Sequence, residues 1–152
     1  MTRTLRRILL AEDSTKDVEL TLEALARHRL ANEVVVVPDG AEAWEYLTLQ
    51  GRYVDRAPGN PAVALLDLKM PRVDGLELLR RMKSDPALCS IPVVMLTSSG
   101  EERDVVESYR LGVNAYVIKP VAFADFMEAV SSLGLFWAVL NEPPPGSIRR
   151  AA

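Results

Sequence analysis

Short, almost continuous apolar runs alternate along the chain with longer segments in which apolar residues recur at helical spacing. Such runs are typical of parallel strands that are buried on both faces of a sheet. The five runs lie at residues 8–11, 34–37, 63–66, 93–96 and 116–118. Helices are predicted between and after them, at residues 19–29, from 40, from 76, at 101–111 and at 123–140. This alternation predicts an α/β protein with helices on both faces of a parallel sheet.

Turn and capping residues mark the ends of these elements. Asp39 suits the N-cap of the helix that Gly40 opens, and Asp74-Gly75 is a turn signal before the next helix. Pro86 ends that helix, and Gly112 suits the position just after the following one. With right-handed crossovers, the expected fold is a flavodoxin-like, doubly wound, five-stranded parallel sheet of order 2-1-3-4-5 with five helices.

Polar residues stand at the ends of four of the strands. Glu12 and Asp13 follow the first apolar run, and the third, fourth and fifth strands are expected to end at Asp67, Thr97 and Lys119. In open α/β sheets, reactive groups collect at the carboxyl ends of the strands. We therefore expect three acids, a hydroxyl and an ammonium to meet in one crevice.

This set of groups is suited to phosphate and Mg²⁺ chemistry. Three neighbouring carboxylates repel one another unless a cation lies among them, and oxygen-only ligands favour Mg²⁺. One carboxylate could attack phosphorus and form an aspartyl phosphate. Lys119 would neutralise the phosphoryl oxygens during transfer, and Thr97 would hydrogen-bond one of them in the product.

The motifs around these residues resemble those of receiver domains of two-component response regulators. The matching segments are residues 10–13, 38–43, 65–75, 94–98 and 112–120, in the order and spacing of that family. The resemblance implies a phosphorylated signalling module, not an enzyme, that receives its phosphoryl group from a histidine kinase.

The resemblance also implies roles for the residues of the crevice. Asp67 would be the phosphoacceptor, and Lys119 would contact the phosphoryl group. Asp13, Asp67 and the main-chain oxygen of Lys69 would be ligands of Mg²⁺, with Glu12 completing the acidic metal site.

A switch is implied in the same way. Thr97 and Tyr116 would form a switch pair, in which Thr97 moves toward the phosphoryl group and Tyr116 turns inward. Pro120 would follow Lys119 through a cis bond. Such a change is a shift between populations that exist before phosphorylation.

A narrower resemblance suggests the partner. Residues 13–17, the long connection at 51–61, Ser108-Tyr109 and Phe136-Trp137 are similar to stand-alone receivers paired with bacterial and cyanobacterial phytochrome kinases. The similarity implies a light-sensing histidine kinase as phosphoryl donor.

Composition limits the other classes of function. The 152 residues suffice for one domain, expected at residues 1–142, with a Pro-containing tail at 143–152. The net charge of −3 provides no basic surface for nucleic acid. No apolar stretch is long enough to span a bilayer, so we expect a cytoplasmic protein without a membrane partner.

Three residue types with few copies add little chemistry. Cys89 is the only cysteine, so an internal disulfide is excluded, and we expect it to be a small, partly buried filler. His28 is the only histidine, which excludes a zinc cluster or a His-based catalytic pair. Trp44 is expected in the core between helix and sheet.

Other functions remain as alternatives. The receiver could act as a phosphate sink or shuttle in a phosphorelay. An aspartyl-phosphate phosphatase of the haloacid dehalogenase kind has a second Asp two residues after its nucleophile, where this chain has Lys69. A flavodoxin-like FMN binder is disfavoured because Glu12 and Asp13 would repel the flavin phosphate.

The last predicted helix has more apolar surface than one sheet needs. One stripe consists of Phe126, Val130, Leu133, Trp137 and Leu140, and a second of Phe123, Met127, Phe136 and Val139. One stripe suffices to cover a sheet, and exposed aromatic patches mark interaction sites. We expect a homodimer whose interface includes Tyr109, Phe136 and Trp137, unless the tail folds over that face.

Overall fold

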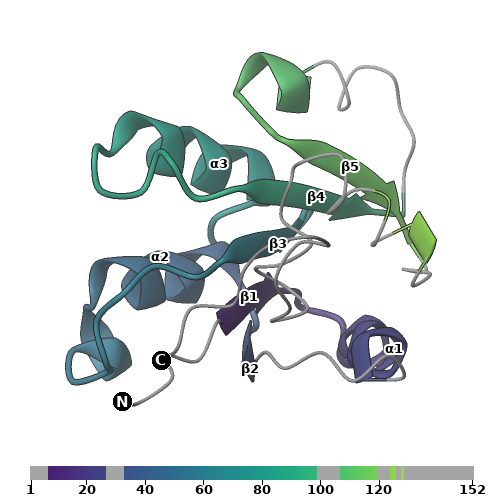
Figure 1. The fold of residues 1–152 in the computed structure, drawn as a ribbon, viewed down its shortest axis with the longest axis horizontal. Helices are drawn as coiled ribbons and strands as arrows, with labels where there is room; N and C mark the ends of the chain where they lie inside the picture. Colours follow the sequence, from purple (N-terminus) through teal and green to yellow (C-terminus); the bar gives the residue numbers. More distant parts are fainter. Residues whose placement is uncertain (1–6, 27–32, 99–106, 120–123, 126–127, 129–152) are drawn as a thin grey trace, which may run out of the picture.

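A five-stranded parallel sheet forms the centre of the molecule. The computed structural model describes residues 7–26, 33–98 and 107–119 and the single residues 124, 125 and 128. The strands are β1 (Arg7–Ala11), β2 (Glu33–Val37), β3 (Val63–Asp67), β4 (Val93–Thr97) and β5 (Ala115–Ile118). Their order is β2-β1-β3-β4-β5 (Figure 1). The predicted doubly wound order 2-1-3-4-5 is confirmed.

The carboxyl ends of the central strands are level with one another. Ala11 of β1 pairs with Leu66 of β3, and Asp67 pairs with Leu96 of β4. Residues that follow β1, β3 and β4 therefore emerge at the same edge of the sheet, where open α/β sheets form their binding crevice.

Helices cover both faces of the sheet. Figure 1 shows α2 (Gly40–Thr48) and α3 (Gly75–Ser84) on one face and α1 (Thr15–Ala26) on the other. Alternate strand residues supply the two cores because successive side chains of a strand point to opposite faces. Leu9 and Leu66 pack in the core under α2 and α3, whereas Leu10 and Leu65 pack in the core under α1.

Helix α1 begins earlier than predicted. The expected start at Glu19 is wrong, because Ser14 caps the helix and Thr15 is its first residue. The Ser14 hydroxyl oxygen accepts a hydrogen bond from the Asp17 amide at 3.3 Å, and the Ser14 carbonyl accepts one from Val18 at 2.9 Å. Asp17 therefore lies in the first turn of α1, at the carboxyl edge of the sheet.

The other two helices have the capping residues that the sequence indicates. Asp39 accepts a hydrogen bond from the Glu42 amide at 2.8 Å, which confirms it as the N-cap of α2. Asp74, predicted in a turn, is the N-cap of α3 and accepts from the Glu77 amide at 2.8 Å. Side-chain oxygens at these positions satisfy amides that have no partner within the helix.

The last two predicted helices are only partly described. Residues 107–110 are helical, as are 124, 125 and 128, and Gly112 has a φ of 97°, as its position after a helix requires. The rest of segments 101–111 and 123–140 lies outside the described residues, so the prediction of five helices stays a prediction. So does the boundary between the domain and the 143–152 tail.

The long connection after α2 is an ordered structure at the amino edge of the sheet. It contains a short 3-10 helix, η1 (Gly51–Tyr53), and is held by Arg56. The Arg56 Nε donates to the Tyr46 carbonyl at 2.7 Å, and its guanidinium lies 4.2 Å from the Tyr46 ring centroid. The connection reaches β3 where the Ala62 amide donates to the Arg7 carbonyl at 2.8 Å. It therefore lies at the opposite edge from the residues that follow the strands.

Two minor predictions have different outcomes. Trp44 is half-buried and packs against the core under α2 and α3, as expected. Cys89 is exposed, so its predicted role as a partly buried filler is wrong. It lies in the turn that follows α3, where Leu88 is the buried residue.

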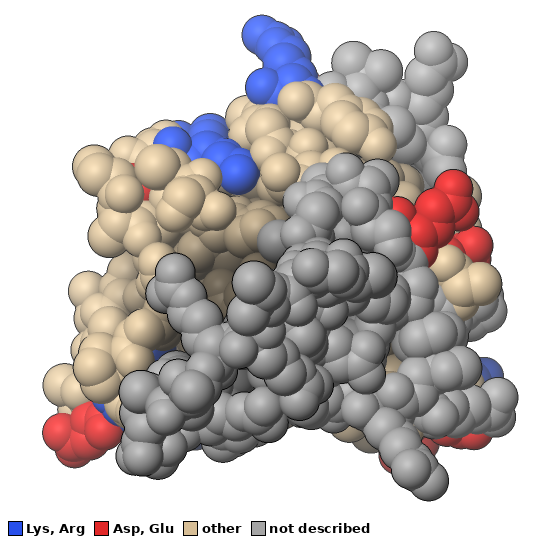
Figure 2. Space-filling model, viewed as in Figure 1, with Lys and Arg blue, Asp and Glu red and all other residues tan. Residues whose placement is uncertain are grey.

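Figure 2 shows that this face of the molecule carries both basic and acidic side chains in its described part, with the acidic ones toward the edges.

Candidate functional site

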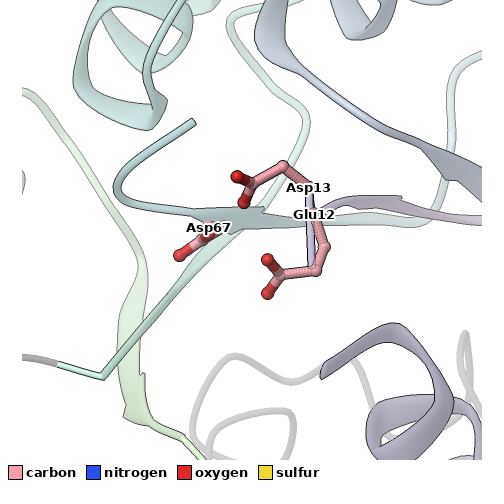
Figure 3. A group of neighbouring side chains, drawn as sticks. All are labelled: Glu12, Asp13 and Asp67. Atoms are coloured by element: carbon pink, nitrogen blue, oxygen red, sulfur yellow. The ribbon is translucent and has the colours of Figure 1, made fainter. Parts of the chain in front are cut away.

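Three carboxylates meet at the carboxyl edge of the sheet. Glu12 and Asp13 follow β1, and Asp67 is the last residue of β3. One oxygen from each lies within 4.8 Å of the other two, and Figure 3 shows the side chains projecting on the same side of this edge. Glu12 is 2% exposed and Asp67 6%, whereas Asp13 is exposed. The predicted convergence of the three acids is confirmed.

Main-chain hydrogen bonds fix the positions of these acids. The Glu12 amide donates to the Val37 carbonyl at 3.0 Å, which extends the pairing of β1 with β2 by one residue. The Glu12 carboxylate accepts from the Ser14 amide at 3.2 Å. Beyond Asp67, the Leu68 amide donates to the Leu96 carbonyl at 2.9 Å. The Glu12 and Asp67 carboxylates are therefore attached to backbone that belongs to the sheet ladder, which keeps them close despite their repulsion.

Lys119 supplies a positive charge to the cluster. Its Nζ lies 2.8 Å from Glu12 Oε1 and 3.4 Å from Asp67 Oδ1, and its side chain is only 9% exposed. This placement agrees with the prediction that the ammonium following β5 joins the acids. The same Nζ also lies 2.8 Å from Asp17 Oδ2 on α1, a contact that sequence reasoning missed.

The environment changes the proton affinity of both partners. Burial raises the pKa of Asp67 to about 7, the hydrogen bond and charge of Glu12 add to this, and Lys119 opposes it. Burial lowers the pKa of Lys119, but hydrogen bonds to Asp17 and Glu12 and the nearby carboxylate charges outweigh burial and raise it above its ordinary value. Without a further cation, the site thus carries more negative charge than one ammonium can balance.

A family comparison identifies this arrangement. The model of the response regulator receiver domain matches residues 8–131. The chain belongs to the response regulator receiver family. The matched region of this receiver includes Glu12, Asp13 and Asp67, which form the three-carboxylate cluster, and also Lys119.

Three relatives show which kind of response regulator this chain resembles. The response regulator Rcp1 of Synechocystis sp. is 41% identical over 130 residues, which cover 86% of this chain and 87% of Rcp1. The solved structure of the bacteriophytochrome response regulator RtBRR is 62% identical, with a TM-score of 0.83 and coverage of 95% of this chain and 87% of RtBRR. The phosphorylated cyanobacterial phytochrome response regulator RcpA is 41% identical, with a TM-score of 0.74 and coverage of 88% and 94%. The predicted resemblance to phytochrome-associated response regulators is confirmed.

The remaining predicted site residues of the receiver are described to different extents. Thr97 is the last residue of β4 and pairs with Ile118 of β5, but its side chain lies outside the described part. Tyr116 of β5 is half-buried and packs against the core under α2 and α3. Lys69 is exposed. Tyr109 is 54% exposed.

Three residues cannot be compared with the structure. Two of them are Phe136 and Trp137, which are predicted in a dimer interface, and the third is Pro120, which is predicted to follow a cis bond. All three lie outside the described residues.

Across the ranges that the structure describes, no helix has the length and apolar character needed to cross a membrane.

The loop that follows Asp67 is tightly held by its surroundings. The Gly40 amide donates to the Val73 carbonyl at 3.1 Å, and a Cβ at Gly40 would overlap that carbonyl oxygen. A Cβ at Gly75 would overlap the main-chain oxygen of Asp67. Arg72 adopts a φ of 68°, which is uncommon for a residue other than glycine. Strain of this kind persists where the surroundings over-determine the backbone, as they do beside this receiver's acidic cluster.

Proposed function

We propose that this receiver accepts a phosphoryl group on Asp67 from a histidine kinase and so acts in two-component signal transduction. The observation that carries the proposal is the position of Asp67. Its buried carboxylate ends the central strand, lies among the acids of the cluster and is 3.4 Å from the Lys119 ammonium. In the described part of the chain, this is the group of acids whose oxygens approach one another closely enough to hold a metal.

The transfer needs little chemistry from the protein itself. A carboxylate oxygen of Asp67 attacks phosphorus, the bond from phosphorus to the donor histidine nitrogen breaks, and the imidazole leaves with the electron pair of that bond. The three equatorial phosphoryl oxygens carry the charge in the transition state. Lys119 is placed to neutralise part of it, because its ammonium is already beside Asp67 and largely withdrawn from water.

The acidic cluster fits Mg²⁺, which we propose as the cofactor. Glu12, Asp13 and Asp67, with the main-chain oxygen of Lys69, would hold the ion, either directly or through its waters. Their donor atoms are all oxygens, and the carboxylate charges exceed that of one ammonium, as a hard divalent cation requires. When bound, the ion supplies charge neutralisation for the phosphoryl group. Among relatives, Rcp1 has a solved structure described as its Mn(2+)-bound form, 36% identical to this chain with a TM-score of 0.72.

We propose that Thr97 and Tyr116 report the phosphorylation state. A phosphoryl group adds about −1.5 to −2 charges and strong acceptor oxygens next to β4. Thr97 ends the strand that pairs with β3, and Tyr116 lies on the next strand opposite Met95. A change at Asp67 therefore has a short route through adjacent strands to the half-buried ring of Tyr116.

The similarity to Rcp1, RtBRR and RcpA supports a phytochrome-type histidine kinase as the donor. A role as phosphate sink or shuttle in a phosphorelay uses the same acceptor and is the second candidate. A phosphatase acting on external phosphoesters is less well supported, because the exposed Lys69 stands where such enzymes have an acid.

We also propose a homodimer through the face that includes Tyr109, with Phe136 and Trp137. Tyr109 is exposed on the described part of this face, and exposed aromatic side chains are enriched at interfaces. Light scattering at micromolar concentration should show a dimer that Trp137→Ala shifts toward monomer. A protein that stays monomeric at high concentration, phosphorylated or not, would contradict the dimer.

Acetyl phosphate labelling tests the acceptor. Wild-type protein with acetyl phosphate and Mg²⁺ should gain one phosphoryl group by intact-mass measurement, and excess EDTA should prevent the gain. Asp67→Asn should gain none, whereas Asp55→Asn, which removes an exposed acid after η1, should behave like wild type. Stoichiometric labelling of Asp67→Asn would overturn the assignment. Phosphotransfer from purified phytochrome-type kinases then tests the donor, and faster transfer from kinases of another sensor class would contradict it.

A further inference from the structure

Lys119 has two close acidic partners, and one of them lies outside the three-carboxylate cluster. Its Nζ donates to Glu12 Oε1 and to Asp17 Oδ2, each at 2.8 Å, while Asp67 Oδ1 is farther away at 3.4 Å. A lysine ammonium has three N–H donors. In the unphosphorylated receiver, two of these are directed to Glu12 and Asp17, and the acceptor Asp67 has the longest of the three contacts.

Asp17 is held in place for this contact by the start of α1. Its amide donates to the Ser14 hydroxyl oxygen, which caps the helix. The Asp17 side chain is 31% exposed, whereas that of Lys119 is 9% exposed. Among the interactions that raise the pKa of Lys119, the hydrogen bond to Asp17 is the largest. Because Asp17 is fixed on α1, the Lys119 ammonium loses its hydrogen bond to Asp17 when it moves away from α1.

We infer that Asp17 is a positioning residue, which holds the Lys119 ammonium on the α1 side of the site and competes for it with the phosphoryl group on Asp67. This inference rests on the proposed function. Phosphorylation adds about −1.5 to −2 charges beside Lys119. The ammonium must then turn toward the phosphoryl oxygens, and the Asp17 carboxylate loses its partner and is repelled by the new charge. Asp17 thus favours the unphosphorylated state.

The sign of the effect follows from these charges. Removal of the Asp17 charge should stabilise the phosphorylated form, because Lys119 is free to bind the phosphoryl group and one repulsive charge is gone. The pair is partly exposed, so solvent reduces the effect, and we expect roughly a three- to tenfold change. Asp17→Glu keeps the charge on the same turn and should restore wild-type behaviour.

Binding of beryllofluoride with Mg²⁺, a mimic of the phosphoryl group, measures this directly. Asp17→Asn should bind it roughly three- to tenfold more tightly than wild type and should lose its phosphoryl group more slowly after acetyl phosphate is removed. Glu19→Gln is the matched control. It removes the same charge from the same helix at an exposed position two residues away, on another side of the helix. Equal effects of Asp17→Asn and Glu19→Gln would overturn the inference, since a general charge effect would then suffice.

A second measurement does not depend on phosphorylation. In metal-free protein, the ¹H–¹⁵N signal of the Lys119 ammonium should be visible, because two charged hydrogen bonds and burial slow its exchange with water. Asp17→Asn should broaden or shift that signal, whereas Glu19→Gln should not. An unchanged ammonium signal in Asp17→Asn would overturn the positioning role of Asp17, even if Asp67 is shown separately to accept a phosphoryl group. A wild type that binds no beryllofluoride and gains no phosphoryl group instead overturns the proposed function, and with it this inference.

Discussion

Replacing Asp67 by Asn should stabilise the metal-free protein, and the gain should grow as the pH rises. Asp67 is buried with Glu12 at the end of β3, and its pKa rises from an ordinary value of 3.8 to about 7 in the folded protein. Between these two values, the folded chain binds more protons than the unfolded chain. The free energy of unfolding of the wild type therefore falls as the pH rises through this window.

The magnitude follows from the difference in pKa. At about 1.4 kcal/mol per pKa unit, the destabilisation by ionised Asp67 is at most about 4 kcal/mol above pH 7. Roughly 2–3 kcal/mol of this appears between pH 5 and pH 8. Asn is nearly isosteric and does not titrate, so Asp67→Asn should not show this loss. Lys119 keeps Glu12 and Asp17 as partners in the variant, which limits the cost of the substitution.

Urea denaturation in EDTA at pH 5 and pH 8 provides the measurement. The difference in unfolding free energy between Asp67→Asn and wild type should increase by roughly 2–3 kcal/mol from the lower to the higher pH. Mg²⁺ should remove most of that increase, because a divalent cation offsets the repulsion among the carboxylates. Asp55→Asn, at an exposed position, should show no such trend. A difference that is the same at both pH values would refute the reasoning.

Three further substitutions test the packing of the acceptor loop, of the core and of the connection after α2. Gly75→Ala should cost about 1–3 kcal/mol and slow acetyl phosphate labelling, because its Cβ would overlap the main-chain oxygen of Asp67; labelling at the wild-type rate would contradict this. Leu66→Ala, at a fully buried position on β3, should cost about 2–5 kcal/mol by urea denaturation, and a smaller loss would mean that the core refills the cavity. Arg56→Met should cost about 1–2 kcal/mol by removing the bond to the Tyr46 carbonyl, yet leave the labelling rate unchanged because the connection lies at the far edge of the sheet.

Much of the fold could be predicted because the strands are buried on both faces. Continuous apolar runs leave few alternatives to a central parallel sheet, and the polar residue that ends each run marks the edge where the site lies. The strand ends at Asp67 and Thr97 were predicted correctly for this reason. The last strand ends at Ile118, one residue earlier than predicted, because pairing with β4 stops there.

The contacts of α1 could not be predicted in the same way. The pattern of apolar residues begins after Asp17, so it placed the start of the helix too late. A serine followed three residues later by an acid is a capping signal that would have moved the start to Thr15. Even then, the approach of Asp17 to Lys119 depends on how α1 packs against the sheet, and these residues are 102 positions apart in the chain. The exposure of Cys89 likewise depends on how its turn lies against the core.

The close contact between Gly40 of α2 and Val73 restrains the loop after Asp67 on one side only. On the side of α2, the loop abuts backbone, with no side chain between that could change rotamer and make room. A closely packed backbone contact resists compression. When a bulky group is added to Asp67, we therefore expect the displaced atoms to move away from α2, toward β4 and β5. Gly40 would thus block movement toward α2 and so determine the direction in which the molecule responds to phosphorylation.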